Sequence, residues 1–295
     1  MELDCEGCAG CCVDWRPLDS AAAGSDRAGP RPPLDDVYGL APVTRDEVAR
    51  FVDDGLGDAL VPRLFEPAER DETVTVDGTD LAAVDGRPVF VVGLRKPPKP
   101  VAPIGTEEPR WLDACAFLDP TTLQCRIHDT DRYPRTCSTY PGHNLELGAE
   151  TECERVAAAG GGERLLDDDP PDDLPAPAFG PQALGATVFA YPDPDDLDGV
   201  VAGLRDGEAT PDDRARFVGA AVGSRPGSLS VARDRMADAR ARAREADSWV
   251  GNAIREWTAR AGADGDPVGA TAESVAELVR ETEDDAGAPG TPGWD

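Results

Sequence analysis

The chain has eight cysteines, and all of them fall into two clusters that lie far apart in the sequence. Near the N-terminus stands the first cluster, Cys5-Glu-Gly-Cys8-Ala-Gly-Cys11-Cys12. The second cluster comprises Cys115, Cys125, Cys137 and Cys153. Thiolates are soft ligands for zinc and iron, and eight of them are enough for two four-thiolate sites. The sequence therefore predicts that the two clusters meet around one or two metal centres.

The spacing within the first cluster, C-x-x-C-x-x-C, is the one that holds a cubane iron–sulfur cluster in bacterial ferredoxins. That signature is incomplete here, because Cys12 follows Cys11 directly and no proline comes after it. A fourth ligand would then come from the second cluster. Adjacent side chains of an extended chain point in different directions. Cys11 and Cys12 therefore suit two neighbouring centres, or one centre beside a packed or redox-active thiol.

The overall charge indicates the ionic strength at which the protein folds and works. Its formal net charge is −29, with 58 acidic and 29 basic residues. Self-repulsion of this kind opposes compaction, but in molar salt the Debye length falls to roughly 3 Å and most of the repulsion is screened. We interpret the composition as halophilic, suited to a salt-rich cytoplasm; an acidic protein of an ordinary cell is the alternative. So negative a surface predicts no nucleic-acid partner.

The N-terminus and the apolar runs predict the compartment. The chain begins without the basic and apolar regions of a secretory signal, and no apolar run approaches the roughly 20 residues of a membrane span. We therefore expect a soluble cytoplasmic protein that does not associate with membranes. Cytoplasmic thiols are normally kept reduced, which favours metal ligation as the use of the cysteines. Disulfides are the alternative.

The distribution of apolar, acidic and Pro/Gly-rich stretches predicts an α+β fold. Residues 1–156 are expected to form a small, metal-stapled, cysteine-rich domain of short strands and helices, with an α/β insert at about 37–104. An acidic Gly/Pro linker at 157–179 then leads into a mainly α-helical region at 180–285. The remaining residues, 286–295, are expected to be a disordered tail.

Local patterns in the insert predict a helix and two strands. The stretch Thr44–Glu47 is a capping box, which marks the start of a helix. Strands are expected at 73–77 and 88–94, with turns at Asp77-Gly78 and Asp85-Gly86.

Around the second cluster, two short apolar segments predict a small hairpin with Cys115 and Cys125 near its ends. Pro134 suits the first position of a short helix, which would hold Cys137. The proline-rich stretch 96–100 predicts an extended connector. Beyond the linker, apolar periodicity predicts helices at 195–205, 211–222, 229–261 and 271–283.

Polar residues near the second cluster are candidates for supporting roles. Four thiolates around a divalent ion leave a charge of about −2, which favours cationic or N–H neighbours. Arg126, Arg132 and Arg135 could supply that charge, and solvated surface arginines are the alternative. His128 and His143 could add ligands, or they could be hydrogen-bonded surface histidines.

These motifs resemble the CxxCxxCC cysteine-cluster family, also called YkgJ-like proteins, which is described as a zinc- or iron-chelating domain. The quadruplet at residues 5–12 matches the name motif, and the segments around Cys115, Cys125 and Pro134–Pro141 resemble the downstream block. Tyr133 stands where the family usually has arginine, and His128 where a tyrosine is usual. The resemblance covers about the first 156 residues and implies metal binding without a settled reaction.

Three functions fit these observations. The first is a cysteine-cluster protein that binds zinc or iron, including a 4Fe-4S cluster, to order its N-terminal domain and present it to a protein partner. The second is an iron–sulfur-dependent enzyme, such as an oxidoreductase or the protein-modifying methylase that the resemblance suggests; the sequence marks no catalytic residue for it. The third is a thiol redox switch at Cys11-Cys12 or at one C-x-x-C pair.

Overall fold

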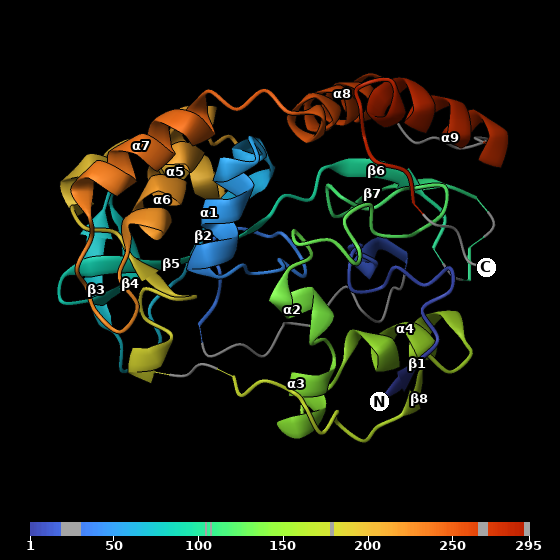
Figure 1. Cartoon of the computed structure of the whole chain (residues 1–295), viewed down its shortest axis with the longest axis horizontal. Helices are drawn as coiled ribbons and strands as arrows, with labels where there is room; N and C mark the ends of the chain where they lie inside the picture. The colour runs from blue at the N-terminus through green and yellow to red at the C-terminus, as the bar shows by residue number, and fades with distance from the viewer. Residues whose placement is uncertain (19–30, 104, 107, 178–179, 265–270, 292–295) are drawn as a thin grey trace.

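The computed structural model describes residues 1–18, 31–103, 105–106, 108–177, 180–264 and 271–291. It shows the predicted mixture of helices and strands (Figure 1). The main sheet is antiparallel and has the strand order β2-β5-β4-β3, with β9 added beside β5. Its strands are β2 (Leu60–Leu64), β3 (Glu72–Val76), β4 (Thr79–Val84), β5 (Arg87–Leu94) and β9 (Phe189–Ala190).

Tight turns join β3 to β4 and β4 to β5 at the two predicted positions. Asp77 and Gly78 have φ of 51° and 76°, and Asp85 and Gly86 have φ of 51° and 68°. Two successive residues in the left-handed region are typical of a two-residue hairpin turn, for which Asp-Gly is well suited. The predicted turns are confirmed, and they fix the register of three neighbouring strands.

Helices from both ends of the chain cover this sheet (Figure 1). The predicted capping box is confirmed, since the Thr44 and Glu47 side chains cap one another's backbone N–H groups at the start of α1 (Arg45–Asp53). From the C-terminal half come α5 (Val201–Arg205), α6 (Pro211–Gly223) and α7 (Arg233–Arg244). Phe90 of β5 lies against Phe189 and Phe217, with ring centroids 5.4 and 5.0 Å apart.

The stretch predicted as a linker, 157–179, does not separate two cores, because the same hydrophobic core includes residues from both sides of it. The first of its residues complete α4 (Glu152–Gly160), and β8 (Leu165–Asp167) pairs with β1 (Glu2–Leu3). Residues 178–179 lie outside the described part of the chain.

The helix predicted over 229–261 is broken into α7 and α8 (Trp249–Asp264). At the break, the backbone N–H and the hydroxyl of Ser248 donate to the carboxylate of Asp58, at 3.0 and 2.6 Å. A carboxylate that accepts from the residue before a helix competes with continuation of the preceding helix. The apolar stripe runs across the break, so periodicity alone could not show it.

Of the other three predicted helices, the one over 211–222 is confirmed as α6, and the remaining two are interrupted. In place of 195–205 there is a 3-10 helix, Pro194–Leu197, and then α5, with Gly199 at φ 76° between them. In place of 271–283 there is α9 (Ala272–Val279), followed by a wider helical turn over Arg280–Asp284.

The proline-rich stretch after β5 is a strand and not a free connector. Here β6 (Pro98–Val101) pairs antiparallel with β7 (Arg110–Asp113), and α8 lies over it (Figure 1). The fully buried Lys99 of β6 donates to the carboxylate of Glu283, at 2.6 Å, and to two backbone carbonyls of the cysteine-bearing hairpin. This ion pair attaches the end of the chain to the hairpin.

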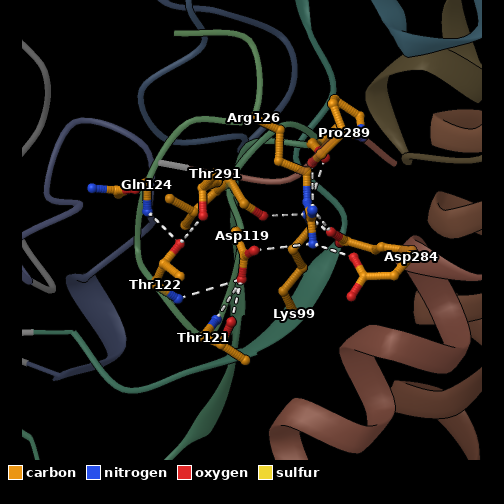
Figure 2. Close-up of polar contacts among 12 residues, drawn as sticks. Lys99, Asp119, Thr121, Thr122, Gln124, Arg126, Asp284, Pro289 and Thr291 are labelled. Carbon is orange, nitrogen blue, oxygen red and sulfur yellow. Dashed lines mark hydrogen bonds and ion pairs between the residues drawn. The ribbon is translucent and has the colours of Figure 1, made fainter. Parts of the chain in front are cut away.

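The tail prediction is wrong for the described residues 286–291. Figure 2 shows Arg126 donating to the carbonyl of Pro289, at 2.6 Å, while the hydroxyls of Thr122 and Thr291 lie 3.0 Å apart. Arg126 also pairs with Glu283, at 2.8 Å. The residues in each contact are more than 150 positions apart in the chain, so local composition could not reveal these contacts. Residues 292–295 lie outside the described range.

Candidate metal centre

The structure places the two cysteine clusters side by side. Backbone hydrogen bonds join them, from the N–H of Cys115 to the carbonyl of Cys12, at 2.8 Å, and from Asp14 to Asp113, at 2.7 Å. Between these bonds Val13 forms an antiparallel bridge with Ala114. The thiols of the two clusters are therefore carried by adjacent segments, and all eight are free.

The backbone of the first cluster folds back on itself in a tight turn. Gly7 and Ala9 have φ of 62° and 48°, in the left-handed region that glycine adopts without strain and alanine rarely adopts. Gly10 allows a close approach, because a Cβ at this position would lie 2.5 Å from Cγ2 of Val156. Val156 belongs to α4, which also contains Cys153, so Gly10 sets the distance between the first cluster and α4.

The second cluster occupies the predicted elements. Leu118 bridges to Cys125, and the N–H of Arg126 donates to the carbonyl of Phe117 at 2.8 Å, which confirms a small hairpin between Cys115 and Cys125. The helix α2 (Arg135–Ser138) contains Cys137, with Pro134 as its N-cap. After the short helix α3 (Gly142–Glu146), Cys153 lies in the first turn of α4.

Burial and mutual repulsion raise the pKa of most thiols. Burial, followed by neighbouring thiolates, raises the pKa of Cys5 to about 11 and that of Cys153 to about 12. A raised pKa with burial as its largest cause is shared by Cys8, Cys115, Cys125 and Cys137. Cys11 adds repulsion at every one of the other seven thiols. All eight sulfurs thus share one electrostatic neighbourhood, with Cys11 common to all.

Besides Cys11, different thiols act most strongly on Cys153 and on Cys137. The pKa of Cys153 is raised by Cys8 and Cys5, whereas the pKa of Cys137 is raised by Cys115 and Cys125. The pKa of Cys12 is raised in part by repulsion from Cys115 and Cys137. We call Cys5, Cys8, Cys11 and Cys153 the N-terminal set. We call Cys12, Cys115, Cys125 and Cys137 the hairpin set.

The two sets meet at the adjacent pair Cys11 and Cys12, whose sulfurs lie 3.9 Å apart. A hydrogen bond from Cys12 lowers the pKa of Cys11 to about 7, and the same bond raises the pKa of Cys12. The pair therefore places one thiolate-prone sulfur at the junction of the two sets.

Backbone amides point at several of these sulfurs. The N–H of Gly10 donates to Cys8 and that of Phe117 to Cys115, and each bond lowers the pKa of its thiol. Cys125 accepts two such bonds, from Ile127 and His128. In each case a donor lies two residues after the cysteine. Amide donors around thiolates are a regular feature of metal centres, because they stabilise the charge of the ligands.

The cations near the thiols are not those that the sequence suggested. Lys96 lowers the pKa of both Cys11 and Cys115, and Arg164 lowers that of Cys5 and Cys8. Lys99 adds to the effect at Cys115. The chain has no lysine other than these two. Because nearly all basic residues of this acidic chain are arginines, the two lysines stood out in the sequence as candidates for a special role.

The three candidate arginines are engaged elsewhere. Arg126 is buried against Glu283, and Arg132 pairs with Asp54 on the surface, at 2.6 Å. The backbone N–H of Arg135 donates to Glu47, at 2.6 Å, while its side chain is exposed. These contacts favour a structural role for Arg126 and the surface alternative for the other two.

Both histidines are hydrogen-bonded away from the thiols. His128 is exposed, lies 3.1 Å from Asp129, and contacts the ring of Tyr133 with centroids 4.7 Å apart. Nε2 of His143 lies 2.7 Å from the carbonyl oxygen of Pro175. These positions agree with hydrogen-bonded surface histidines.

A buried carboxylate in α4, missed by the sequence analysis, holds that helix against the first cluster. Glu152 accepts hydrogen bonds from the indole of Trp15, at 3.0 Å, and from the hydroxyl of Tyr38, at 2.7 Å. Arg155 neutralises it at 2.8 Å. This network fixes the position of Cys153 next to residues 5–12.

The spacing of the sulfurs bears on the kind of metal centre that they could hold. Within the described ranges, no three thiols have sulfurs that all lie within 4.8 Å of one another; only the exposed carboxylates of Asp167–Asp169 are grouped so closely. A tetrahedral zinc site with Zn–S bonds of about 2.3 Å needs sulfurs about 3.8 Å apart. A polynuclear cluster, in which each thiolate binds a different metal atom, suits wider spacing.

The helices and strands define a mixed α+β protein in which the two cysteine clusters lie on adjacent segments. The chain belongs to a family of unknown function, DUF7531, whose profile matches residues 1–295. No curated protein and no solved structure matches it. The resemblance to the CxxCxxCC family stays a prediction. Among the helices of the described residues, none is both long enough and apolar enough to cross a membrane.

Proposed function

We propose that this protein binds metal through its eight thiols, in two neighbouring centres. The observation that carries the proposal is that backbone contacts bring the two cysteine clusters side by side, with the sulfurs of Cys11 and Cys12 3.9 Å apart where they meet. The N-terminal set would hold one centre and the hairpin set the other. Each set draws on segments that are far apart in sequence, so the metal would hold these segments together.

The wide sulfur spacing favours iron–sulfur clusters over mononuclear zinc. Such a cluster would supply one-electron transfer or an iron atom open to a substrate. The chain's own groups would support it in two ways. The amides of Gly10 and Phe117 stabilise thiolates, and Lys96 offsets part of their charge.

The raised pKa values indicate that metal binding and thiol deprotonation are linked. Without a cation, burial and mutual repulsion keep most of the thiols protonated near neutral pH. A bound metal would displace those protons and neutralise the repulsion. Thiols that are carried by adjacent segments and accept hydrogen bonds from backbone amides have little use as isolated core residues.

Anaerobic purification followed by elemental analysis and visible spectroscopy tests the proposal. We expect a brown protein with stoichiometric iron, whereas a colourless protein with stoichiometric zinc would favour the structural zinc alternative. Cys8→Ser should lose the metal of the N-terminal set. Ser138→Ala, a neighbour of Cys137 with an exposed side chain, should retain all of it. Equal metal content in the two variants would contradict the proposal.

A second candidate, the thiol switch, is favoured by one observation. The sulfurs of Cys11 and Cys12 are 3.9 Å apart, and Cys11 has a pKa of about 7. Low-pKa thiols are the reactive ones. Oxidation to a disulfide would transfer two electrons and two protons to a disulfide oxidant. Metal-free protein as isolated, with a thiol titre that falls and recovers reversibly by two per chain, would support this candidate.

We also propose that the protein works in a salt-rich cytoplasm, because its net charge of −29 needs screening. The melting temperature should rise steeply between low and molar potassium chloride. A flat response would favour an acidic protein of an ordinary cell.

A further inference from the structure

A large cavity lies next to the cysteine clusters, where three parts of the chain meet. It has a volume of about 760 Å³, within the range of about 300–1,000 Å³ that is typical of small-molecule sites. Its lining combines the segment after the first cluster, the end of β5, and the helices α6 and α8. Representative residues of these parts are Asp14, Arg95, Arg214 and Ile254.

Most of the charges in this lining are already paired. Asp14 and Asp36 are bound by Arg16, at 2.6 and 3.0 Å. Asp206 lies 3.0 Å from the guanidinium of Arg205. A fourth lining carboxylate, that of Asp35, is bound at 2.6 Å by Arg63, which lies outside the cavity. The fifth lining carboxylate, that of Asp113, belongs to none of these pairs; burial, followed by repulsion from Asp14, raises its pKa, and Lys96 offsets part of that effect.

Arg95 and Arg214 are different. Both are half-buried, and neither forms an ion pair with a carboxylate of the described residues. Arg95 donates to the backbone carbonyl of Asp58, at 3.1 Å, and Arg214 to that of Ala209. Burial, followed by repulsion from Arg214, lowers the pKa of Arg95 to about 10. Two guanidinium groups that repel one another have donors left over for an anion.

Another part of the cavity wall is apolar. Leu40, Leu204 and Ile254 are buried side chains that line it, together with the half-buried Val61. A ligand that satisfies both surfaces has an anionic end and an apolar body. Guanidinium groups bind carboxylates and phosphates by paired N–H donors.

We propose that this cavity binds a small organic oxyanion, a carboxylate or a phosphate monoester with a short apolar chain, between Arg95 and Arg214. Lys96 lines the same cavity and also acts on Cys11 and Cys115, so the ligand would lie beside the cysteine clusters. The proposal does not depend on a metal, because the cavity and its arginines are separate from the thiols.

The test uses the full-length protein as isolated, at constant potassium chloride, with binding measured by ligand-observed NMR titration. The probes are hexanoate, hexyl phosphate, inorganic phosphate and hexylammonium. We expect saturable binding of hexanoate or hexyl phosphate, weaker binding of inorganic phosphate and none of hexylammonium. The tighter of the first two identifies the head group. Absence of saturable binding by both, or equal binding of hexylammonium, would overturn the proposal.

Variants then locate the site. Arg95→Met and Arg214→Met should each raise the dissociation constant of the preferred anion by at least about tenfold, as loss of a charged hydrogen bond implies. Arg225→Met removes the same charge from an exposed position outside the cavity and should change it less than about twofold. Arg214→Lys keeps the positive charge but lacks the paired N–H donors of the guanidinium group, so its dissociation constant should lie between those of the unaltered protein and of Arg214→Met. If Arg225→Met weakened anion binding as much as Arg95→Met or Arg214→Met does, the proposed site would be wrong. Metal content, measured in parallel, reports separately on the thiols.

Discussion

Two regions of this molecule are held together by different forces. The sheet region, formed by α1, α5–α7 and the strands β2–β5 and β9, has a large apolar core in which Phe90 contacts the rings of Phe189, Tyr191 and Phe217. In the cysteine region, residues 1–18 and 128–168, the side chains of Cys8, Trp15 and Val156 form a small separate cluster with Tyr38, and only a few residues such as Ala9 and Val13 join the large core. The first region can fold by burial of apolar surface, whereas the second relies on polar contacts and, on our proposal, on bound metal.

Metal removal should reveal the difference between the two regions most clearly. Structural zinc contributes about 10–16 kcal/mol in small domains, so we expect loss of metal to abolish ordered structure in the cysteine region. Hydrogen exchange after anaerobic chelation should show lost amide protection at residues 5–12 and in α4, with protection retained in β5 and α6. Equal loss in both regions would mean that they are one cooperative unit.

Phe90→Ala should destabilise the sheet region and leave the cysteine region with its metal. Removal of a fully buried aromatic side chain costs about 3–5 kcal/mol, so the free energy of unfolding of the sheet region should fall by about this amount. Metal content should not change, because Phe90 lies outside the cysteine region. Leu147→Ala, at a side chain that is 60% exposed, should be nearly neutral in the same denaturant titration.

Gly10→Ala tests the fit between the first cluster and α4. The added methyl group would collide with Val156, and overpacking costs about 1–3 kcal/mol. We expect weaker metal retention, measured as the chelator concentration for half-release. Val156→Ala in the same chain should restore it, since the colliding Cγ2 atom is removed. A double variant no better than the single one would contradict the proposed collision.

Arg132→Ala should have the smallest effect. Its ion pair with Asp54 is partly exposed, and surface pairs contribute about 0–1 kcal/mol. Metal content and the denaturation midpoint should both stay close to those of the unaltered protein. A large loss of metal would restore Arg132 as a cation that supports the thiolates.

Features set by neighbouring residues could be predicted from the sequence. The capping box at Thr44, the turns at Asp77 and Asp85, and the hairpin between Cys115 and Cys125 each depend on a few adjacent positions. Features set by distant residues could not. Lys99 reaches Glu283, and Ser248 is captured by Asp58, through contacts that only the folded chain creates.

The candidate site shows the same division. Spacing identified the eight cysteines as potential ligands, but it could not show which of them share a neighbourhood. That grouping depends on the first cluster, the hairpin and α4 meeting in space. The sequence could not show that Lys96 and Arg164 act on the thiols, because both are distant in sequence from Cys11 and Cys5, whose pKa values they lower.

The metal-to-protein ratio of three variants tests the central claim most directly. Cys153→Ser removes a ligand of the N-terminal set, Cys125→Ser removes one of the hairpin set, and the double variant affects both. With two separate centres, each single variant should retain about half of the metal of the unaltered protein, and the double variant almost none. If either single variant loses all of its metal, or if the double variant keeps its full content, the division into two four-thiolate centres is wrong.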